Sequence, residues 1–256
     1  MKALGIDIGS FGIKGSIVDT QKGEILTDRY STPPLESSAP HKILSQIHQL
    51  VNKKFAWDGP VGCAFPAPVS HGIVLSSERI DKAWVDADAA ELFSEITGNA
   101  VTVINDSDAT GLAEMQFGAG QDKEGLVVVL TVGTGIGSSL FINGRLVPNT
   151  ELGRVEIGGS PVEMTASNKV RKEEGLTAEE WAGRLQKMLE HFEDIFHPEM
   201  FIVGGQLSQK AGKVLPYLKV KTTVKAARFL NDASIVGAAL VASREQQKIG
   251  MDDFIH

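Results

Sequence analysis

Two similar stretches of sequence decide the fold: GIDIGSFGIKGSIVD at residues 5–19 and LTVGTGIGSSLFINGRL at residues 130–146. Each reads as an apolar strand, a glycine-rich turn and a second strand, and a short oxygen-bearing side chain, Asp7 or Thr131, precedes each turn. The two stretches lie about half the chain apart, which indicates two similar lobes that each contribute a hairpin to one cleft. Chance similarity between two unrelated glycine-rich hairpins is the alternative.

The composition is that of a globular protein with a core of its own. The chain has 256 residues, of which 42% are hydrophobic and 22% are charged. These values exclude a disordered chain, a fibre and a disulfide miniprotein. The net charge of −7 argues against a general binder of nucleic acids or anionic membranes, so we expect neither as a partner.

The single cysteine, Cys63, limits the metal chemistry and suggests a compartment. It excludes an internal disulfide and a cysteine-based zinc cluster, and the histidines show no metal-ligand spacing. Cys63 lies in the strand-like run VGCAF and reads as a buried apolar side chain. One reduced cysteine, short apolar runs and a start unlike a signal peptide together predict a cytoplasmic protein.

Strands and helices alternate along the chain. Buried strands are predicted by apolar runs at residues 3–8, 61–65, 100–104, 126–132 and 200–203. Helices are predicted by apolar spacing at residues 43–55, at 92–96 before Gly98, from the capping box Thr177–Glu180 to 196, and after Asp232. This alternation favours an α/β fold with a largely parallel sheet.

Residues 133–137, Gly-Thr-Gly-Ile-Gly, are typical of a phosphate-binding loop. A phosphate needs several converging backbone N–H groups, and glycines allow the approach because no Cβ stands in the way. The segment lies between two predicted strands and matches neither the P-loop nor the Rossmann pattern. The alternative is an ordinary hairpin turn, which does not need three alternating glycines.

Asn105-Asp106-Ser107-Asp108 follows one predicted strand and precedes a helical pattern. Carboxylates at the carboxyl end of a strand lie where open α/β sheets bind ligands, so one of them is a candidate general base. The alternative is that Asp106 or Ser107 caps the helix that follows.

A third segment, residues 200–231, is basic and holds no acidic residue. On a chain of net charge −7 this asymmetry indicates a track for a polyanion, and a solvated surface is the alternative. The cations are Lys210, Lys213, Lys219, Lys221, Lys225 and Arg228.

Taken together, these segments resemble the ROK (repressor, open reading frame, kinase) family of sugar kinases, and within it the polyphosphate glucokinases, a short branch without the family's zinc-binding cysteines. The resemblance covers nearly the whole chain. Its most specific motifs are INDSDATGLAEMQFGAG at 104–120 and LTVGTGIGSSLFINGRLVPNTELG at 130–153. Shorter matches are GIDIGSFGIKG at 5–15, FPAPV at 65–69, IDKAW at 80–84 and FIVGG at 201–205.

The resemblance implies an α/β, actin-like ATPase fold, ribonuclease H-like and duplicated, with two lobes and a cleft between them. We place the first lobe at residues 1–109, with helix 232–247 packing back on it, and the second at 110–231. The implied reaction is Mg²⁺-assisted transfer of a phosphoryl group from polyphosphate, ATP or both to the 6-hydroxyl of glucose or a related sugar. We further expect a homodimer and no zinc.

The resemblance also assigns roles by position. Asp106 corresponds to the general base that takes the proton of the 6-hydroxyl, and Asp7 to the residue that organises Mg²⁺ through its waters. The sugar site corresponds to Asn105, Asp106, Glu151, Glu163 and Arg154, the last in place of a histidine. The phosphate loops correspond to Gly9, Gly12, Lys14, Thr131, Gly133, Thr134, Gly135 and Gly137, and the adenosine-side loop to Gly204 and Gly205.

Several positions depart from the family's pattern. Ser10-Phe11 alters the first loop, and Ala67 and Gln206 each replace a glycine, while Arg79 replaces an asparagine near the sugar. The departures motivate two alternatives to a glucokinase: a paralogue that binds a sugar or an anion without catalysis, and a kinase whose more anionic acceptor pairs with Arg79 or Arg154. Because a strand begins at residue 3, we expect no helix-turn-helix before it and hence no repressor.

Overall fold

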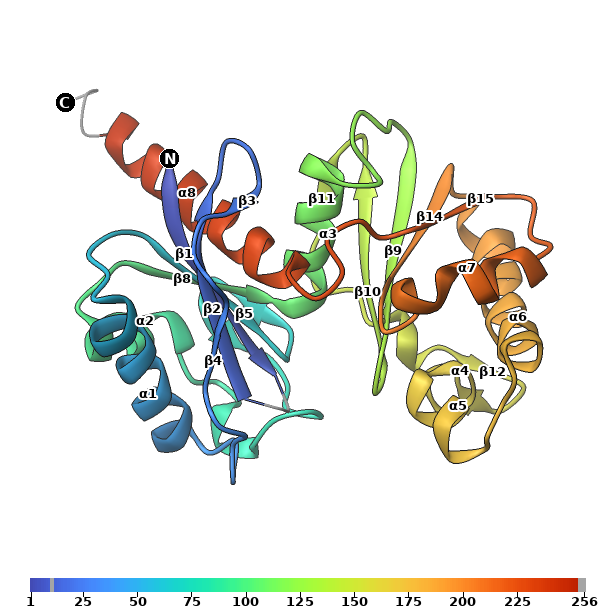
Figure 1. Cartoon of the computed structure of the whole chain (residues 1–256), viewed down its shortest axis with the longest axis horizontal. Helices are drawn as coiled ribbons and strands as arrows, with labels where there is room; N and C mark the ends of the chain where they lie inside the picture. The colour runs from blue at the N-terminus through green and yellow to red at the C-terminus, as the bar shows by residue number, and fades with distance from the viewer. Residues whose placement is uncertain (10–11, 253–256) are drawn as a thin grey trace. The chain divides into compact units, whose positions relative to one another are not determined.

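The computed structural model describes residues 1–9 and 12–252, and the chain divides into two compact units. The first unit comprises Met1–Ala113 and the chain from Asp232 onward, and the second comprises Glu114–Asn231. Each unit is built around a mixed sheet of its own (Figure 1). Among the described residues, no helix is long and apolar enough to cross a membrane.

The sheet of the first unit has six strands in the order β3-β2-β1-β5-β8, with β4 beside β2. β1 (Lys2–Gly9) and β2 (Gly12–Asp19) form an antiparallel hairpin. β5 (Val61–Phe65) lies parallel to β1, and β8 (Val101–Asn105) lies parallel to β5. The carboxyl ends of β1, β5 and β8 therefore meet at one edge of the sheet. The short strands β3 (Glu24–Ile25) and β4 (Tyr30–Ser31) pair antiparallel with β2.

The helices of the first unit pack on this sheet. α1 (Pro40–His48) continues into a π-helical turn, η1 (Gln49–Phe55), and α2 (Ala89–Thr97) ends at Gly98, whose φ of 74° suits glycine. A cluster of three buried aromatic rings, with centroids 5.1 to 6.3 Å apart, joins α2 to the sheet: Phe65, Trp84 and Phe93. The smaller elements are β6 (Val69–Ser70), β7 (Ile73–Val74) and the 3₁₀ turn η2 (Lys82–Trp84).

The last helix, α8 (Ala233–Asp252), lies against β1 and β5 at a separation that only glycine permits. A Cβ added to Gly5 would lie 2.0 Å from the carbonyl oxygen of Ile235, and one added to Gly62 would lie 1.9 Å from that of Ala238. Both glycines are therefore needed to seat α8 on the strands whose ends carry the candidate site.

The sheet of the second unit has the strand order β11-β10-β9-β14-β15. β9 (Leu126–Val132) and β10 (Ile136–Ile142) form an antiparallel hairpin extended by β11 (Arg145–Val147). β14 (Met200–Gly205) and β15 (Thr223–Ala226) run parallel to β9. Each unit thus arranges a hairpin, its outer strand and two parallel strands in the same order. This repeated topology supports duplication over chance similarity of the two hairpins.

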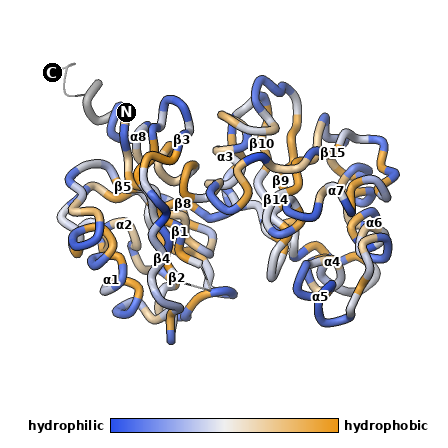
Figure 2. The backbone as a smooth tube through the Cα atoms, in the orientation of Figure 1, coloured by the Kyte–Doolittle hydropathy of each residue, from blue (hydrophilic) through white to orange (hydrophobic). Residues whose placement is uncertain are grey.

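α6 (Ala178–Phe196) packs on the second sheet. It begins with the expected capping box between Thr177 and Glu180, and it buries one apolar face that includes Trp181 and Leu185, so polar and apolar residues alternate along it (Figure 2). The smaller elements are η3 (Leu152–Arg154), β12 (Glu156–Ile157), β13 (Ser160–Pro161), α4 (Glu163–Ala166), α5 (Asn168–Glu173), η4 (Ser208–Lys210), α7 (Ala211–Val214) and η5 (Leu215–Tyr217).

The five predicted strands are confirmed: β5 and β9 have the predicted ends, and the ends of the other three differ by at most two residues. The expectation of a largely parallel sheet is wrong, because each sheet contains an antiparallel hairpin whose short glycine-rich turn is unable to connect parallel strands. The helix predicted for residues 43–55 begins earlier, at Pro40, and changes to π-helical geometry from Gln49 onward. Cys63 is buried in β5 as expected, and this burial raises the pKa of its thiol.

Candidate active site

Asn105 and Asp106 lie where β8 meets α3 (Asp106–Phe117). The side-chain oxygen of Asn105 accepts hydrogen bonds from the backbone N–H groups of Ser107 and Asp108, at 2.9 and 3.1 Å. Asn105 therefore provides the side-chain cap that the sequence analysis considered for Asp106 or Ser107. The carboxylate of Asp106 is left in the first turn of α3, where it accepts a 3.2 Å hydrogen bond from the Ser107 hydroxyl.

The environment of Asp106 makes its carboxylate a better base than an ordinary aspartate. Burial and the negative charge of Asp7 raise the pKa of Asp106 to about 6, and the positive charge of Arg79 opposes the rise. A general base is most effective when its pKa lies near the working pH. The geometry thus brings together a candidate base, a second carboxylate and one cation.

Asp7 lies near the carboxyl end of β1, at the sheet edge that also holds Asp106. It faces Lys14 across the β1–β2 hairpin, with 3.9 Å between the ammonium and the carboxylate, and 17% of its side chain is exposed. Burial raises the pKa of Asp7, while Lys14 and a hydrogen bond to Ser234 of α8 lower it. The sequence prediction omits Ser234, because nothing in the sequence places it beside residue 7.

The first loop contains two predicted glycines, and the backbone geometry requires glycine at one of them. Gly9 and Gly12 pair at the tip of the β1–β2 hairpin. Gly12 has a φ of 112°, and a Cβ there would lie 2.8 Å from the carbonyl oxygen of Thr32, so the backbone itself requires glycine. Ser10 and Phe11, the departures between them, lie outside the described residues.

The second loop contains a glycine that the fold does not require. Among the described residues nothing lies within 4 Å of a Cβ added to Gly133, and Gly133 has no positive φ. Its carbonyl oxygen accepts hydrogen bonds from the N–H groups of Asn168 and Lys169 at the start of α5, which holds the loop in place. A glycine without a packing or conformational reason is the form expected where a ligand approaches the backbone. Thr131, Thr134, Gly135 and Gly137 belong to the same hairpin.

The other predicted residues of the second unit lie around this hairpin. Glu163, the first residue of α4, accepts a 3.3 Å hydrogen bond from the N–H of Ile136 at the start of β10. Glu151 precedes η3, Arg154 is its last residue, and the two form a 3.4 Å ion pair with each other. The structure therefore gathers Glu151, Arg154 and Glu163 beside the glycine-rich loop.

Gly204 and Gly205 end β14, the strand next to the loop-bearing β9. Gly205 has a φ of 68° and lies close to the backbone of Val132, so its glycine serves the fold. The next residue, Gln206, hydrogen-bonds with Asn168, the residue whose N–H also holds Gly133. A glutamine side chain therefore occupies the space that a third glycine would leave open.

The predicted site residues divide between the two units. The first unit holds Asp7, Gly9, Gly12, Lys14, Asn105 and Asp106. The second unit holds Thr131, Gly133, Thr134, Gly135, Gly137, Glu151, Arg154, Glu163, Gly204 and Gly205. Each set contains two carboxylates and one cation, and the second set holds the larger number of glycines.

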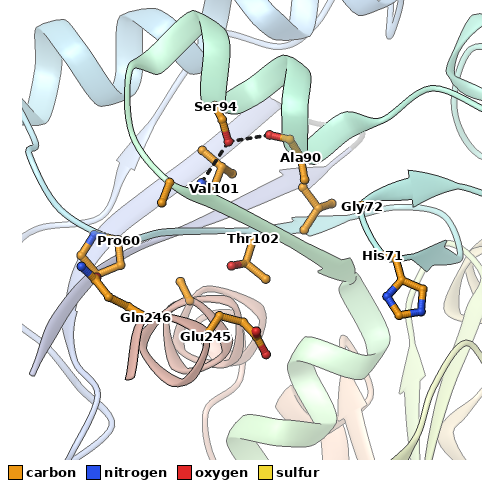
Figure 3. A pocket seen from close by; sticks show the side chains of 12 residues that line it. Pro60, His71, Gly72, Ala90, Ser94, Val101, Thr102, Glu245 and Gln246 are labelled. Carbon is orange, nitrogen blue, oxygen red and sulfur yellow. Dashed lines mark hydrogen bonds between the residues drawn. The ribbon is translucent and has the colours of Figure 1, made fainter. Parts of the chain in front are cut away.

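Two of the pockets in the described part of the first unit bear on the location of the site. The larger, about 680 Å³, follows the outer edge of β8 between α2 and α8, and His71, Thr102 and Glu245 line it (Figure 3). None of the predicted site residues lines this pocket. The smaller pocket, about 260 Å³, is lined by Gly9, Pro66 and Arg79, and so adjoins the sheet edge that holds Asp106.

Comparison with known proteins agrees with this geometry. A model of the ROK family matches residues 3–162. The chain belongs to the ROK family. A polyphosphate glucokinase of Mycobacterium tuberculosis (strain CDC 1551 / Oshkosh) is 41% identical over 240 residues, which cover 93% of this chain and 90% of that protein.

Solved structures of ROK proteins share the fold. The inorganic polyphosphate/ATP-glucomannokinase of Arthrobacter sp. strain KM superposes with a TM-score of 0.90 at 41% identity, covering 95% of this chain and 99% of that one. A ROK glucokinase from Streptomyces griseus, in complex with glucose and AMPPNP, gives a TM-score of 0.78 at 22% identity and covers 95% and 100% of the two chains. The expected duplicated, actin-like ATPase fold is thereby confirmed.

Proposed function

We propose that this ROK protein is a sugar kinase that transfers a phosphoryl group from polyphosphate or ATP to the 6-hydroxyl of glucose or a related sugar. The observation that carries the proposal is the state of the Asp106 carboxylate. Asn105 caps α3 in its place, and the pKa of Asp106 is raised to about 6. The relatives that are about 40% identical over most of the chain are polyphosphate glucokinases and a polyphosphate/ATP-glucomannokinase, which supports the same reaction.

In the proposed mechanism, Asp106 accepts the proton of the sugar hydroxyl as its oxygen attacks the terminal phosphorus of the donor. Asn105, Glu151 and Glu163 would orient the sugar through its other hydroxyls, with Arg154 beside them. The base matters because an alkoxide does not form at neutral pH without a proton acceptor, whereas the phosphoryl transfer itself needs chiefly positioning and charge neutralisation. A sensor that only binds its ligand has no need of such a base.

The donor's phosphates would bind at the glycine-rich hairpins. Gly133, with open space where its Cβ would lie, lets backbone N–H groups approach the phosphate oxygens, and the hydroxyls of Thr131 and Thr134 are further donors. Lys14, 29% exposed and paired with Asp7, would supply a positive charge from the first hairpin. Gly204 and Gly205 would lie on the nucleoside side when ATP is the donor.

Mg²⁺ fits the first hairpin on chemical grounds. Among the described residues no cluster of three or more histidine, cysteine or acidic side chains forms a complete metal site. Mg²⁺ needs no such cluster, because it keeps several waters and commonly binds through one or two carboxylates and the substrate's phosphates. Asp7 would hold it through water, and the bound ion would supply charge neutralisation for the donor.

The basic segment would guide a long polyphosphate. Its six cations are all exposed. The fold modifies the sequence-based expectation of an acid-free surface, because Glu193 of α6 accepts hydrogen bonds from the backbone N–H groups of Lys221 and Thr222. Hydrogen bonding to Thr222 and, to a smaller extent, the charge of Lys221 lower the pKa of Glu193. We therefore assign the track to the five cations that remain: Lys210, Lys213, Lys219, Lys225 and Arg228.

The test is a kinase assay with Mg²⁺, polyphosphate or ATP, and glucose or mannose, in which the sugar phosphate formed is measured directly. Replacing Asp106 by alanine should lower turnover by about 10²- to 10⁴-fold, the usual effect of losing a general base. The circular dichroism spectrum should be unchanged. An Asp106→Ala variant with near-wild-type turnover would contradict the proposal.

A further inference from the structure

The smaller pocket of the first unit, about 260 Å³, adjoins the sheet edge that holds the candidate base. Gly9 lies two residues after Asp7 in β1, and Pro66 follows Phe65, which is paired with Asn105 in the sheet. The pocket therefore opens at the carboxyl edge where Asp7 and Asp106 lie. Drug-sized ligands fill pockets of roughly 300–1,000 Å³, so this one suits a smaller molecule such as a monosaccharide.

Among the described residues that line this pocket, Arg79, in the turn before η2, is the only basic one. The acidic residue of the lining is Glu36. Its side chain is 89% exposed, and its carboxylate lies 4.0 Å from the ammonium of Lys42. The guanidinium of Arg79 also acts electrostatically on Asp106. A ligand between them meets a proton acceptor at one end and a permanent positive charge at the other.

This arrangement is more than a neutral sugar needs. Hydroxyl groups are bound well by uncharged side chains, whereas the planar fork of a guanidinium matches the two oxygens of a carboxylate or phosphate. Ser37 and Ser38, which also line the pocket, add hydroxyls that suit the rest of a sugar. Ile8 and Ile80 supply an apolar surface for its ring or chain.

We propose that the preferred acceptor is an anionic monosaccharide, with a carboxylate or phosphate at the end remote from its primary hydroxyl, and that Arg79 binds that group. The inference rests on the proposed kinase function and names its substrate class. In the reaction, the bond between the donor's terminal phosphorus and its bridging oxygen breaks, and a bond from that phosphorus to the acceptor's hydroxyl oxygen forms. The hydroxyl proton passes to Asp106, and the donor leaves as ADP or as polyphosphate one phosphate shorter.

The experiment compares four acceptors that share a primary hydroxyl: gluconate, glucose 1-phosphate, neutral glucose and cationic glucosamine. Donor consumption is followed by ³¹P NMR, so that every product is detected. We expect kcat/KM for gluconate or glucose 1-phosphate to exceed that for glucose at least about 10-fold, the effect of one charge-assisted hydrogen-bonded pair. The two anions distinguish a carboxylate from a phosphate as the recognised group.

Variants of Arg79 assign the preference. Arg79→Asn should lower the ratio of anionic to neutral acceptor by about 10-fold or more, mainly through KM, and Arg79→Lys should restore part of it. Arg145→Gln is the matched control, because this exposed arginine lies in β11, at the end of the second hairpin remote from its glycine-rich turn. It should leave all four rates unchanged.

Two outcomes overturn the inference separately from the function. Glucose preferred over both anions, with an acceptor ratio unaffected by Arg79→Asn, would refute the anionic acceptor while the kinase proposal stands. Transfer to none of the acceptors would refute the proposed function. Calorimetric binding of gluconate and glucose 1-phosphate to the wild type and to Arg79→Asn then decides the inference: tighter binding that needs Arg79 supports it, and its absence refutes it.

Discussion

The raised pKa of Asp106 predicts that the candidate base destabilises the protein that carries it. The pKa rises from 3.8 to about 6, so between these values the folded chain holds a proton that the unfolded chain releases. The free energy of unfolding must then fall as the pH rises from about 4 to about 6. This difference in pKa corresponds to at most about 3 kcal/mol, and contact with water at the partly exposed carboxylate reduces it to about 1–2 kcal/mol.

Replacing Asp106 by asparagine removes the charge and keeps an acceptor for the Ser107 hydroxyl. At pH 7.5 the variant should be more stable than the wild type by about 1–2 kcal/mol, because it no longer buries a carboxylate near Asp7. At pH 4 the two proteins should be equally stable, since the wild-type carboxyl is then protonated. Turnover should fall by about 10²- to 10⁴-fold in the same variant.

Urea unfolding at both pH values, followed by circular dichroism, measures the two free energies. Asp28→Asn, at an exposed aspartate of the same unit, is the control and should change neither. A destabilised Asp106→Asn at pH 7.5 would refute the reasoning, and so would a gain of equal size at both pH values. Stability that rises as turnover falls is the expected mark of a site strained for function.

Three further predictions follow from the geometry. kcat/KM should fall as the pH drops below about 6, because the protonated Asp106, near Asp7 and Arg79, is unable to accept a proton; a flat profile between pH 5 and 7 would exclude it as the base. Gly133→Ala should fold normally, since no described atom lies near the new Cβ, but raise the donor KM about 10-fold or more; an unchanged KM removes the loop from the phosphate site. Binding of long-chain polyphosphate should weaken with salt more steeply than binding of ATP. Replacing Lys210, Lys213 and Lys225 together by glutamine should raise the KM for polyphosphate more than the KM for ATP, while Lys221→Gln, beside Glu193, should have little effect. Equal effects on both donors would refute the track.

Local signals in the sequence predicted most of the elements. Apolar runs gave the strands, Thr177 and Glu180 gave the start of α6, and the two glycine-rich hairpins indicated a repeat that the strand order supports. The mixed sheets were not anticipated, because the alternation of strands and helices says nothing about the direction in which a hairpin's second strand runs. The alternative that Asp106 or Ser107 caps α3 is wrong, because three neighbouring polar side chains are equally able to cap and only the folded backbone selects Asn105.

Long-range contacts were beyond local signals. Ser234 reaches Asp7 because Gly5 and Gly62 let α8 approach the sheet, and the sequence alone does not pair these distant positions. Glu193 of α6 lies beside Lys221 because the fold brings two segments that are distant in sequence together, although the basic segment itself contains no acid. Residues that act through the fold, rather than through their neighbours in sequence, are the ones that sequence reasoning misses.

The two hairpins carry different side chains at corresponding positions. The cross-strand pair Asp7–Lys14 of the first hairpin corresponds in position to Thr131–Gly137 of the second. A carboxylate in the second hairpin would repel the donor's phosphates, whereas an uncharged threonine and the open position at Gly133 would leave backbone N–H groups to bind them. In the first hairpin, Asp7 keeps a negative charge near Asp106 and so raises its pKa toward the value a base requires. The same strand order thus holds a proton acceptor in one unit and, we propose, a phosphate loop in the other, and exchanging Asp7 and Thr131 should impair both.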